Sequence, residues 1–156
     1  MKRLLILGVC FVLLISCEDK VYIPDNNFEQ ALIDLGYDDA IDGYVLKNSI
    51  NNCKELDVSS KGISYLNGIE GFSALTSLHC YSNKLTSLDV SGCTALTYLN
   101  CGNFGSGNQL TSLDVSQNTT LFNFTCDYNL LTSLDLRNGN NNILTYLNAS
   151  NNPYLN

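Results

Sequence analysis

Three near copies of one hexapeptide carry acidic side chains that are the first candidates for chemistry. LTSLDV occupies residues 85–90 and recurs unchanged at residues 110–115, and LTSLDL occupies residues 131–136. Each copy holds an aspartate between two apolar residues, and these are Asp89, Asp114 and Asp135. Stacked about 5 Å apart, their charges would repel by about 1 kcal/mol in water, and a bound cation would relieve that repulsion.

Calcium is the cation that such a column suggests, but it takes roughly six or more oxygen ligands and a flat column supplies few. Neighbouring hydroxyls can instead donate hydrogen bonds to the carboxylates, and these belong to Ser87, Ser112 and Ser133. The sequence therefore favours a solvent-facing column of aspartates, with a calcium site as the minor alternative.

Cysteine and histidine offer a second kind of chemistry. Cys80, Cys101 and Cys126 each stand two residues after a leucine or phenylalanine. Zinc sites use close pairs such as C-x-x-C, whereas a buried cysteine packs like a small apolar residue, so we expect a column of core residues. His79 is the only histidine, and its neighbour Cys80 would point to the opposite face of a strand. Because a catalytic histidine needs a nucleophile within reach, we predict a protein that is not an enzyme and uses no cofactor.

Length and charge narrow the class of protein further. The 156 residues are enough for one domain, and an apolar content of 45% is enough to build a core. The net charge is −7, and only 15% of the residues are charged. Nucleic-acid binding needs clustered lysine and arginine to neutralise phosphates, so the composition argues against that partner.

The amino terminus has the layout of an export signal. A basic start is followed by an apolar run over residues 4–15, which is shorter than the roughly 20 residues of a membrane span. The end of this run and the two residues after it read Leu-Ile-Ser-Cys (residues 14–17), which resembles the lipobox of bacterial lipoproteins. This resemblance implies a signal peptide over residues 1–16, lipid on Cys17 and a lipidated tether over residues 17–24. It also implies an outer-membrane lipoprotein that faces either the cell surface or the periplasm.

An internal repeat underlies the candidate residues. Similar units begin at Leu75, Leu96, Leu121 and Leu144, at spacings of 21, 25 and 23 residues. The first unit, LTSLHCYSNKLTSLDVSGCTA, contains two segments that match the leucine-rich-repeat signature L-x-x-L-x-L-x-x-N/C-x-L. Two such segments in 21 residues resemble the short bacterial class called IRREKO-type, and residues 56–75 resemble an internalin-type repeat. The chain is thus similar to bacterial leucine-rich-repeat lipoproteins.

The repeat predicts a short, right-handed, β-rich α/β solenoid with parallel strands on two sides. Stacked coils bury leucines that one coil cannot bury alone, and their strands lie about 4.8 Å apart. The first side is expected to hold the strands Leu56–Val58, Leu78–Cys80, Leu99–Cys101, Phe124–Cys126 and Leu147–Ala149. The second side is expected to hold the strands Leu88–Val90, Leu113–Val115 and Leu134–Leu136.

Asparagines at the turns are expected to satisfy buried backbone groups of the coils. The residues that occupy this position are Asn83, Asn108, Asn118, Asn129 and Asn152, and Cys93 replaces asparagine in one half-coil.

Residues 25–53 differ from the repeats and are expected to form a helical amino-terminal cap, with leucine-rich repeats over residues 54–156. Phe28, Ala31, Leu32 and Leu35 share one helical face that would cover the first coil. No cap follows the last coil, which is therefore expected to expose its apolar interior and a strand edge. Either the chain is a truncated member of a longer family or another molecule covers that end.

The resemblance implies a non-catalytic recognition or adhesion module of the cell envelope, which binds protein or glycan across the first side of the solenoid. Tyrosines beside amides and hydroxyls suit such recognition, since tyrosine offers contact area at little entropy cost. The candidate binding residues are His79, Tyr81, Tyr98, Asn100, Thr125, Tyr128, Tyr146 and Asn148. The alternative function is a structural spacer or assembly unit that self-associates through its carboxyl-terminal edge.

Overall fold

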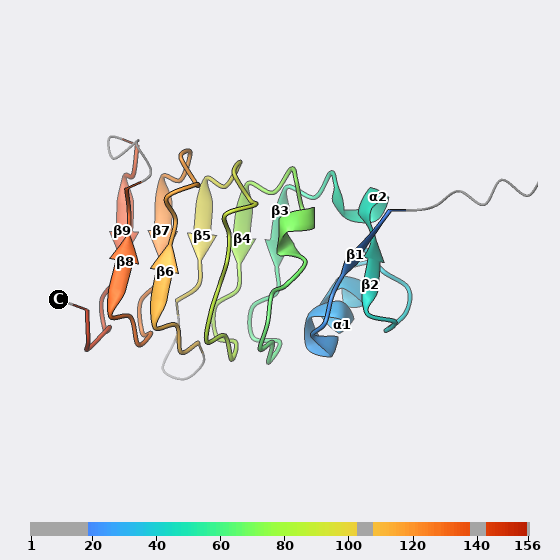
Figure 1. The fold of residues 1–156 in the computed structure, drawn as a ribbon, viewed down its shortest axis with the longest axis horizontal. Helices are drawn as coiled ribbons and strands as arrows, with labels where there is room; N and C mark the ends of the chain where they lie inside the picture. Colours follow the sequence, from blue (N-terminus) through green and yellow to red (C-terminus); the bar gives the residue numbers. More distant parts are fainter. Residues whose placement is uncertain (1–18, 103–107, 138–142, 156) are drawn as a thin grey trace, which may run out of the picture.

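The computed structural model describes residues 19–102, 108–137 and 143–155, which form a solenoid with a cap at its amino-terminal end (Figure 1). A parallel sheet of five strands runs along the first side, and a parallel pair of strands lies on the second side. The cap contains two helices and an antiparallel pair of strands. The predicted architecture, a leucine-rich-repeat solenoid with strands on two sides and a helical cap, is confirmed.

The first sheet is built from one short strand per coil. Its strands are β3 (Glu55–Asp57), β4 (Ser77–His79), β5 (Tyr98–Asn100), β7 (Asn123–Thr125) and β9 (Tyr146–Asn148). Each begins one residue earlier than predicted and ends before the valine, cysteine or alanine. The ladder nevertheless continues past the strands, because the N–H of Cys80 donates to the carbonyl of Asn100 in the next coil at 2.8 Å.

The second side has only two of the three predicted strands in the described residues. They are β6 (Ser112–Asp114) and β8 (Ser133–Asp135), which pair in register. The predicted strand Leu88–Val90 does not form, although residues 85–90 have the same sequence as residues 110–115. The equivalent residues 66–68 of the preceding coil turn into the 3-10 helix η1 (Ile69–Gly71), so they offer no extended neighbour to pair with. On the other flank, no backbone hydrogen bond in the described chain joins residues 86–90 to residues 111–115.

The core is a stack of apolar residues that occupy the same position in successive coils. Leu56, Leu78, Leu99 and Phe124 are in register across β3, β4, β5 and β7, and all four have an exposed fraction of 0%. Burying one such side chain stabilises the fold by about 1.5–3 kcal/mol, and no single coil could bury it without its neighbours.

The predicted asparagine ladder is present at one edge of the coils. Asn83, Asn108, Asn118, Asn129 and Asn152 are all buried. The Asn129 side chain shows the pattern: its amide donates to the carbonyls of Cys101 and Cys126, and its oxygen accepts from the N–H of Leu110. The side chains of Asn83, Asn108, Asn129 and Asn152 each tie their own turn to the preceding coil, whereas Asn118 donates to two carbonyls of the preceding coil, those of Val90 and Cys93. Cys93 takes this position in one half-coil and its thiol contacts the carbonyl of Ile69 at 3.4 Å.

Helix α1 (Asn26–Asp34) fastens the cap to the first coil. Its N-cap residue is Asp25, whose Oδ1 accepts from the N–H groups of Asn27 and Phe28. The other carboxylate oxygen of Asp25 accepts from the N–H groups of Ser64 and Tyr65, which belong to the first coil. One aspartate thus caps the helix and joins the two parts of the fold.

A buried carboxylate organises the remainder of the cap. Glu29 has an exposed fraction of 0%, and its Oε1 accepts from three successive backbone N–H groups, those of Asp42, Gly43 and Tyr44. These contacts place β2 (Tyr44–Leu46), which leads directly into the short helix α2 (Lys47–Ile50). Glu29 therefore acts through tertiary contacts and not as a capping residue of its own helix.

The segment expected to be a plain tether is partly folded. Strand β1 (Lys20–Tyr22) pairs antiparallel with β2, and Ile23 is completely buried. From Lys20 onward the tether prediction for residues 17–24 is therefore wrong, since this segment supplies backbone pairing and apolar surface to the cap. Residues 1–16 and Cys17 lie outside the described residues. Within the described chain, no helix has the length and apolar character needed to span a bilayer.

Candidate functional site

The candidate surface is the outward side of the first sheet, here called the sheet face. Side chains alternate along a strand, so each strand buries its central residue and presents the first and third. The registered pairing brings these presented residues into two rows that cross all five strands. The first row is Glu55, Ser77, Tyr98, Asn123 and Tyr146, and the second is Asp57, His79, Asn100, Thr125 and Asn148.

A stacked aromatic pair stands near the amino-terminal end of the sheet face. The rings of His79 and Tyr98 are stacked, with centroids 4.7 Å apart and planes at 27°. The hydroxyl of Ser77 lies 3.2 Å from His79 Nε2, and a carboxylate oxygen of Glu55 lies 4.0 Å from the same nitrogen. These contacts hold the imidazole in place, and Tyr98 covers one of its faces. The pair is a rigid, partly apolar platform with a polar rim.

Two acidic residues at the start of the sheet face were missed by the sequence analysis. Glu55 and Asp57 flank Leu56 as Ser77 and His79 flank Leu78, so their repeat position was sufficient to find them. Burial alone would raise the pKa of Asp57, but hydrogen bonds from the Ser59 amide and hydroxyl, together with nearby His79, hold this pKa below its usual value. The face thus runs from an acidic end to a neutral, amide-rich end.

The structure gathers most of the predicted binding residues on this face. His79, Tyr98, Asn100 and the more distant Thr125, Tyr146 and Asn148 all lie on its two rows. Tyr81 and Tyr128 do not, because they stand in the turns that follow β4 and β7. Tyr128 is 46% exposed and has a left-handed backbone with φ of 51°, a conformation shared by Ser60, Ser82 and Asn151 at equivalent turns.

The aspartates of the repeated hexapeptide close turns. Asp89 accepts from the N–H of Ser91 at 2.9 Å, and Asp114 accepts from the N–H of Ser116 at 2.8 Å. Such an Asx turn pairs a side-chain oxygen with the N–H two residues on. The expected donors Ser87, Ser112 and Ser133 are thus not the ones that the structure shows. Asp135 is held in the same way by the N–H of Arg137, whose guanidinium also pairs with it.

Arg137 changes the electrostatics of this aspartate column. Its hydrogen bonds to Asp135 lower the pKa of that carboxyl to about 2, and its charge also interacts with Asp114. The repulsion that suggested a calcium ion is therefore reduced by a cation of the chain itself. Across the described residues, no group of three or more histidine, cysteine or acidic side chains is arranged to hold a metal ion.

The cysteine column lies in the core. Cys80, Cys101 and Cys126 are 0% exposed and carry free thiols. Burial raises the pKa of the Cys126 thiol to about 12, and it raises the pKa of Cys80 and Cys101 well above the usual range. A thiol that stays protonated is a poor nucleophile and a poor metal ligand, so the column acts as core packing.

The stacked coils, the asparagine ladder and the parallel sheet define a leucine-rich-repeat solenoid. Comparisons with known proteins agree: residues 73–121 match the family model of leucine-rich repeats in two copies. The functional domain of InlJ from Listeria monocytogenes, which includes a cysteine ladder, has a similar structure with a TM-score of 0.71 and 35% sequence identity over 83% of this chain.

A second similar structure is the internalin InlF from the same organism, with a TM-score of 0.63 and 20% identity over 81% of this chain. At this identity the similarity concerns the fold alone. The chain spans 28% of the InlJ chain and 43% of the InlF chain. A comparison with curated proteins gave no match. The protein thus contains leucine-rich repeats arranged in an internalin-like solenoid.

Proposed function

We propose that this protein is a non-catalytic recognition module of the cell envelope that binds a partner protein through the sheet face. The observation that carries the proposal is the ordered row of Tyr98, Asn123 and Tyr146 beside the His79–Tyr98 stack. The leucine-rich-repeat fold supports it, because solenoids of this type present extended binding surfaces.

The chemistry of the sheet face suits protein recognition. Tyr98 is held by its stack on His79, so little rotamer entropy is lost when a partner covers it. Tyr146 is 51% exposed and offers a large amphipathic area at the other end of the row. Aromatic anchors of this kind account for most of the energy of interfaces, about 2 kcal/mol or more for a central residue.

The test is a protein and glycan array probed with the protein and with Tyr98→Ala/Tyr146→Ala. A partner that uses the sheet face should bind the double variant at least tenfold more weakly. The matched control is Tyr22→Ala/Tyr44→Ala, which removes two exposed tyrosines from the cap. Equal binding by all three forms would place the site elsewhere, and selective loss of a glycan instead of a protein would change the partner class.

Attachment to the outer membrane through lipid on Cys17 completes the proposal. It is supported by the basic start, the apolar run and the lipobox-like ending of residues 1–17. Because β1 begins at Lys20, lipid on Cys17 would hold the folded cap close to the bilayer. Mass analysis of the mature protein from its bacterial host should show a lipidated amino terminus at Cys17. An unmodified terminus that retains Ser16 would rule out this anchor.

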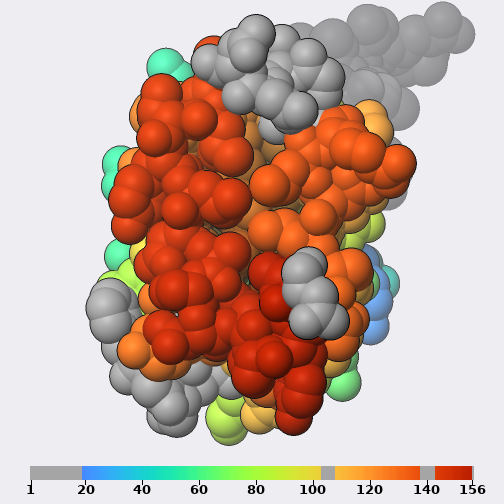
Figure 2. Space-filling view, turned by 90° about the vertical axis from the view of Figure 1, so that its left-hand side faces the viewer, coloured from blue at the N-terminus to red at the C-terminus, as the bar shows by residue number. Residues whose placement is uncertain are grey.

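A second candidate function, assembly through the carboxyl-terminal edge of the described solenoid, rests on exposed apolar residues of the coil that contains β9. Leu147 is 41% exposed, whereas its register partners Phe124 and Leu99 are completely buried. Figure 2 shows this end face, formed by the residues coloured orange and red. Assembly predicts concentration-dependent dimers in sedimentation experiments that Leu147→Lys abolishes. A monomer at all concentrations would exclude this function.

A further inference from the structure

The β1–β2 ribbon of the cap presents an exposed aromatic surface. Because side chains alternate along a strand, the registered pairs Tyr22/Tyr44 and Lys20/Leu46 lie on the same face of the ribbon. Tyr22 is 58% exposed and Tyr44 is 44% exposed, and their ring centroids lie 5.4 Å apart. Lys20 Nζ lies 5.8 Å from the centroid of the Tyr44 ring. We call this surface, formed by Lys20, Tyr22, Tyr44 and Leu46, the cap face.

The cap face points away from the coils of the solenoid. The opposite face of the ribbon carries Val21 and Val45, and Val45 is completely buried. Val21 packs on η1 of the first coil, since a Cβ added to Gly71 would lie only 2.7 Å from its Cγ2. Figure 1 shows the ribbon at the amino-terminal end of the solenoid, beyond β3. The cap face therefore forms part of the surface that ends the molecule on this side.

The proposed lipid site lies three residues before the first residue of the cap face. A residue spans at most about 3.6 Å, so the Cα atom of Lys20 lies within about 11 Å of the Cα atom of Cys17. The chain is fastened from Asp19 onward, because the carbonyl of Asp19 accepts from the N–H of Lys47 at 2.9 Å and β1 pairs with β2. Lipid on Cys17 would thus hold the cap face next to the bilayer.

The chemistry of the cap face suits the interface between lipid and water. Tyrosine is enriched at this level of membrane proteins, where its ring contacts lipid and its hydroxyl stays hydrated. A lysine can lay its aliphatic stem on apolar surface while its ammonium reaches lipid phosphates. Lys20 pairs with Asp42 at 3.4 Å, and Lys47 pairs with Asp19 at 4.0 Å. Each of these aspartates is therefore balanced by a lysine and repels anionic lipid less strongly.

We propose that the cap face rests in the headgroup layer of the membrane that holds the lipid anchor, with the coils projecting away from the bilayer. The inference rests on the proposed lipid at Cys17 and adds the lipid surface as a binding partner of the cap. In this orientation the strands of the first sheet lie at increasing height above the bilayer in the order β3, β4, β5, β7, β9. The sheet face is then turned to the side, where a partner protein can reach it.

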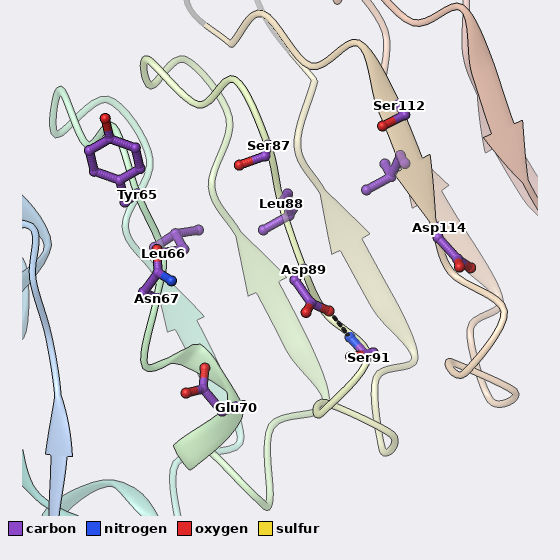
Figure 3. A pocket seen from close by; sticks show the side chains of 11 residues that line it. Tyr65, Leu66, Asn67, Glu70, Ser87, Leu88, Asp89, Ser91, Ser112 and Asp114 are labelled. Carbon is purple, nitrogen blue, oxygen red and sulfur yellow. Dashed lines mark hydrogen bonds between the residues drawn. The ribbon is translucent and has the colours of Figure 1, made fainter.

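The test uses tryptophan as a reporter, because the chain contains none. Three variants each replace one exposed tyrosine: Tyr22→Trp on the cap face, Tyr65→Trp on the second side of the solenoid (Figure 3) and Tyr154→Trp, which follows β9. The lipidated proteins, purified from membranes of the bacterial host, are placed in phosphatidylethanolamine–phosphatidylglycerol vesicles with or without bromine atoms near the headgroup end of the acyl chains. We expect bromine to lower the fluorescence of Tyr22→Trp at least twofold and to leave the two other reporters nearly unchanged.

A second measurement tests the aromatic pair itself. Tyr44→Ser in the Tyr22→Trp protein should reduce the quenching by bromine, whereas Tyr128→Ser, at an exposed tyrosine far from the cap, should not. A protein that carries lipid on Cys17 but shows no quenching of Tyr22→Trp, or quenching that Tyr44→Ser leaves unchanged, would overturn the inference and leave the anchor intact. Stronger quenching of Tyr65→Trp would mean that the solenoid lies on its second side, which also overturns it. A mature protein without lipid on Cys17 would reject the anchor, and the inference with it.

Discussion

Replacement of Asn129 by alanine should show how much one rung of the asparagine ladder stabilises the solenoid. The Asn129 oxygen is the acceptor for the buried N–H of Leu110 at 3.0 Å, and its amide donates to the carbonyls of Cys101, Cys126 and Asp127 at 3.1, 3.2 and 3.2 Å. The carbonyls of Cys101 and Cys126 keep a second donor after the substitution, from Asn108 and Asn152 respectively. The N–H of Leu110 keeps none in the described structure.

The expected loss of stability depends mainly on the Leu110 N–H, which loses its acceptor, and less on the carbonyls that keep another donor. A buried N–H without an acceptor costs about 1–3 kcal/mol, and each shared bond that disappears costs about 0.5 kcal/mol more. Asn129→Ala should therefore lower the free energy of unfolding by about 3 kcal/mol. With a urea dependence of about 1–3 kcal/mol per molar, the midpoint should fall by about 1–3 M.

The assay is urea unfolding followed by circular dichroism, with Asn123→Ala as the control. Asn123 is a half-buried asparagine on the sheet face whose side chain makes no hydrogen bond in the described structure. Its replacement should change the unfolding free energy by less than about 0.5 kcal/mol. If both variants lost the same stability, or Asn129→Ala lost less than about 1 kcal/mol, the ladder would not be a major source of stability.

Other predictions concern the turns, the aspartate column and the core thiols. Tyr128→Asn places a residue that tolerates φ of 51° in a strained turn and should raise the unfolding free energy by about 0.5–1 kcal/mol in urea melts; a decrease would show that the Tyr128 ring packs. Because Arg137 lowers the pKa of Asp135 to about 2, below roughly 3.9 in the unfolded chain, this pair stabilises the fold above about pH 4, and the stabilisation is lost as the pH falls toward 2. Asp135→Asn should accordingly flatten that part of the stability–pH curve, and an unchanged curve would contradict the pairing. Native Cys126, whose pKa is raised to about 12 by burial, should react with iodoacetamide only as fast as the protein unfolds, as timed mass spectrometry would show.

Much of the fold was predictable because the repeat itself shows which residues must pack against their equivalents in neighbouring coils. Leu78 and Leu99 recur at fixed spacing, and a coil of that length can bury them only against the same residues of its neighbours. Asn83 and its equivalents were predictable for the same reason, since a tight turn always leaves backbone groups to satisfy. Most residues of the sheet face were predictable from the alternation of side chains along a strand. Glu55 and Asp57 were overlooked because β3 lies upstream of the clearest repeats.

The cap was harder to predict because its contacts are not periodic. Glu29 lies in the first turn of α1, where sequence patterns suggest a capping role, yet it binds the N–H groups of Asp42 to Tyr44. Strand β1 was read as a tether because three residues carry too short a pattern to indicate a strand, and its partner β2 lies more than twenty residues away.

The repeated hexapeptide separates what local sequence determines from what tertiary structure decides. Sequence alone determines that its leucines face the core and that each aspartate stands at a turn, because alternation and Asx geometry act over two or three residues. It does not determine whether the hexapeptide becomes a strand, since residues 85–90 and 110–115 are identical and only the latter form one. Strand pairing requires an extended neighbour at hydrogen-bonding distance, and that neighbour belongs to another coil. The stacking of the coils supplies it for β6 and β8, whereas residues 66–68 of the preceding coil turn into η1 and offer residues 88–90 no extended neighbour.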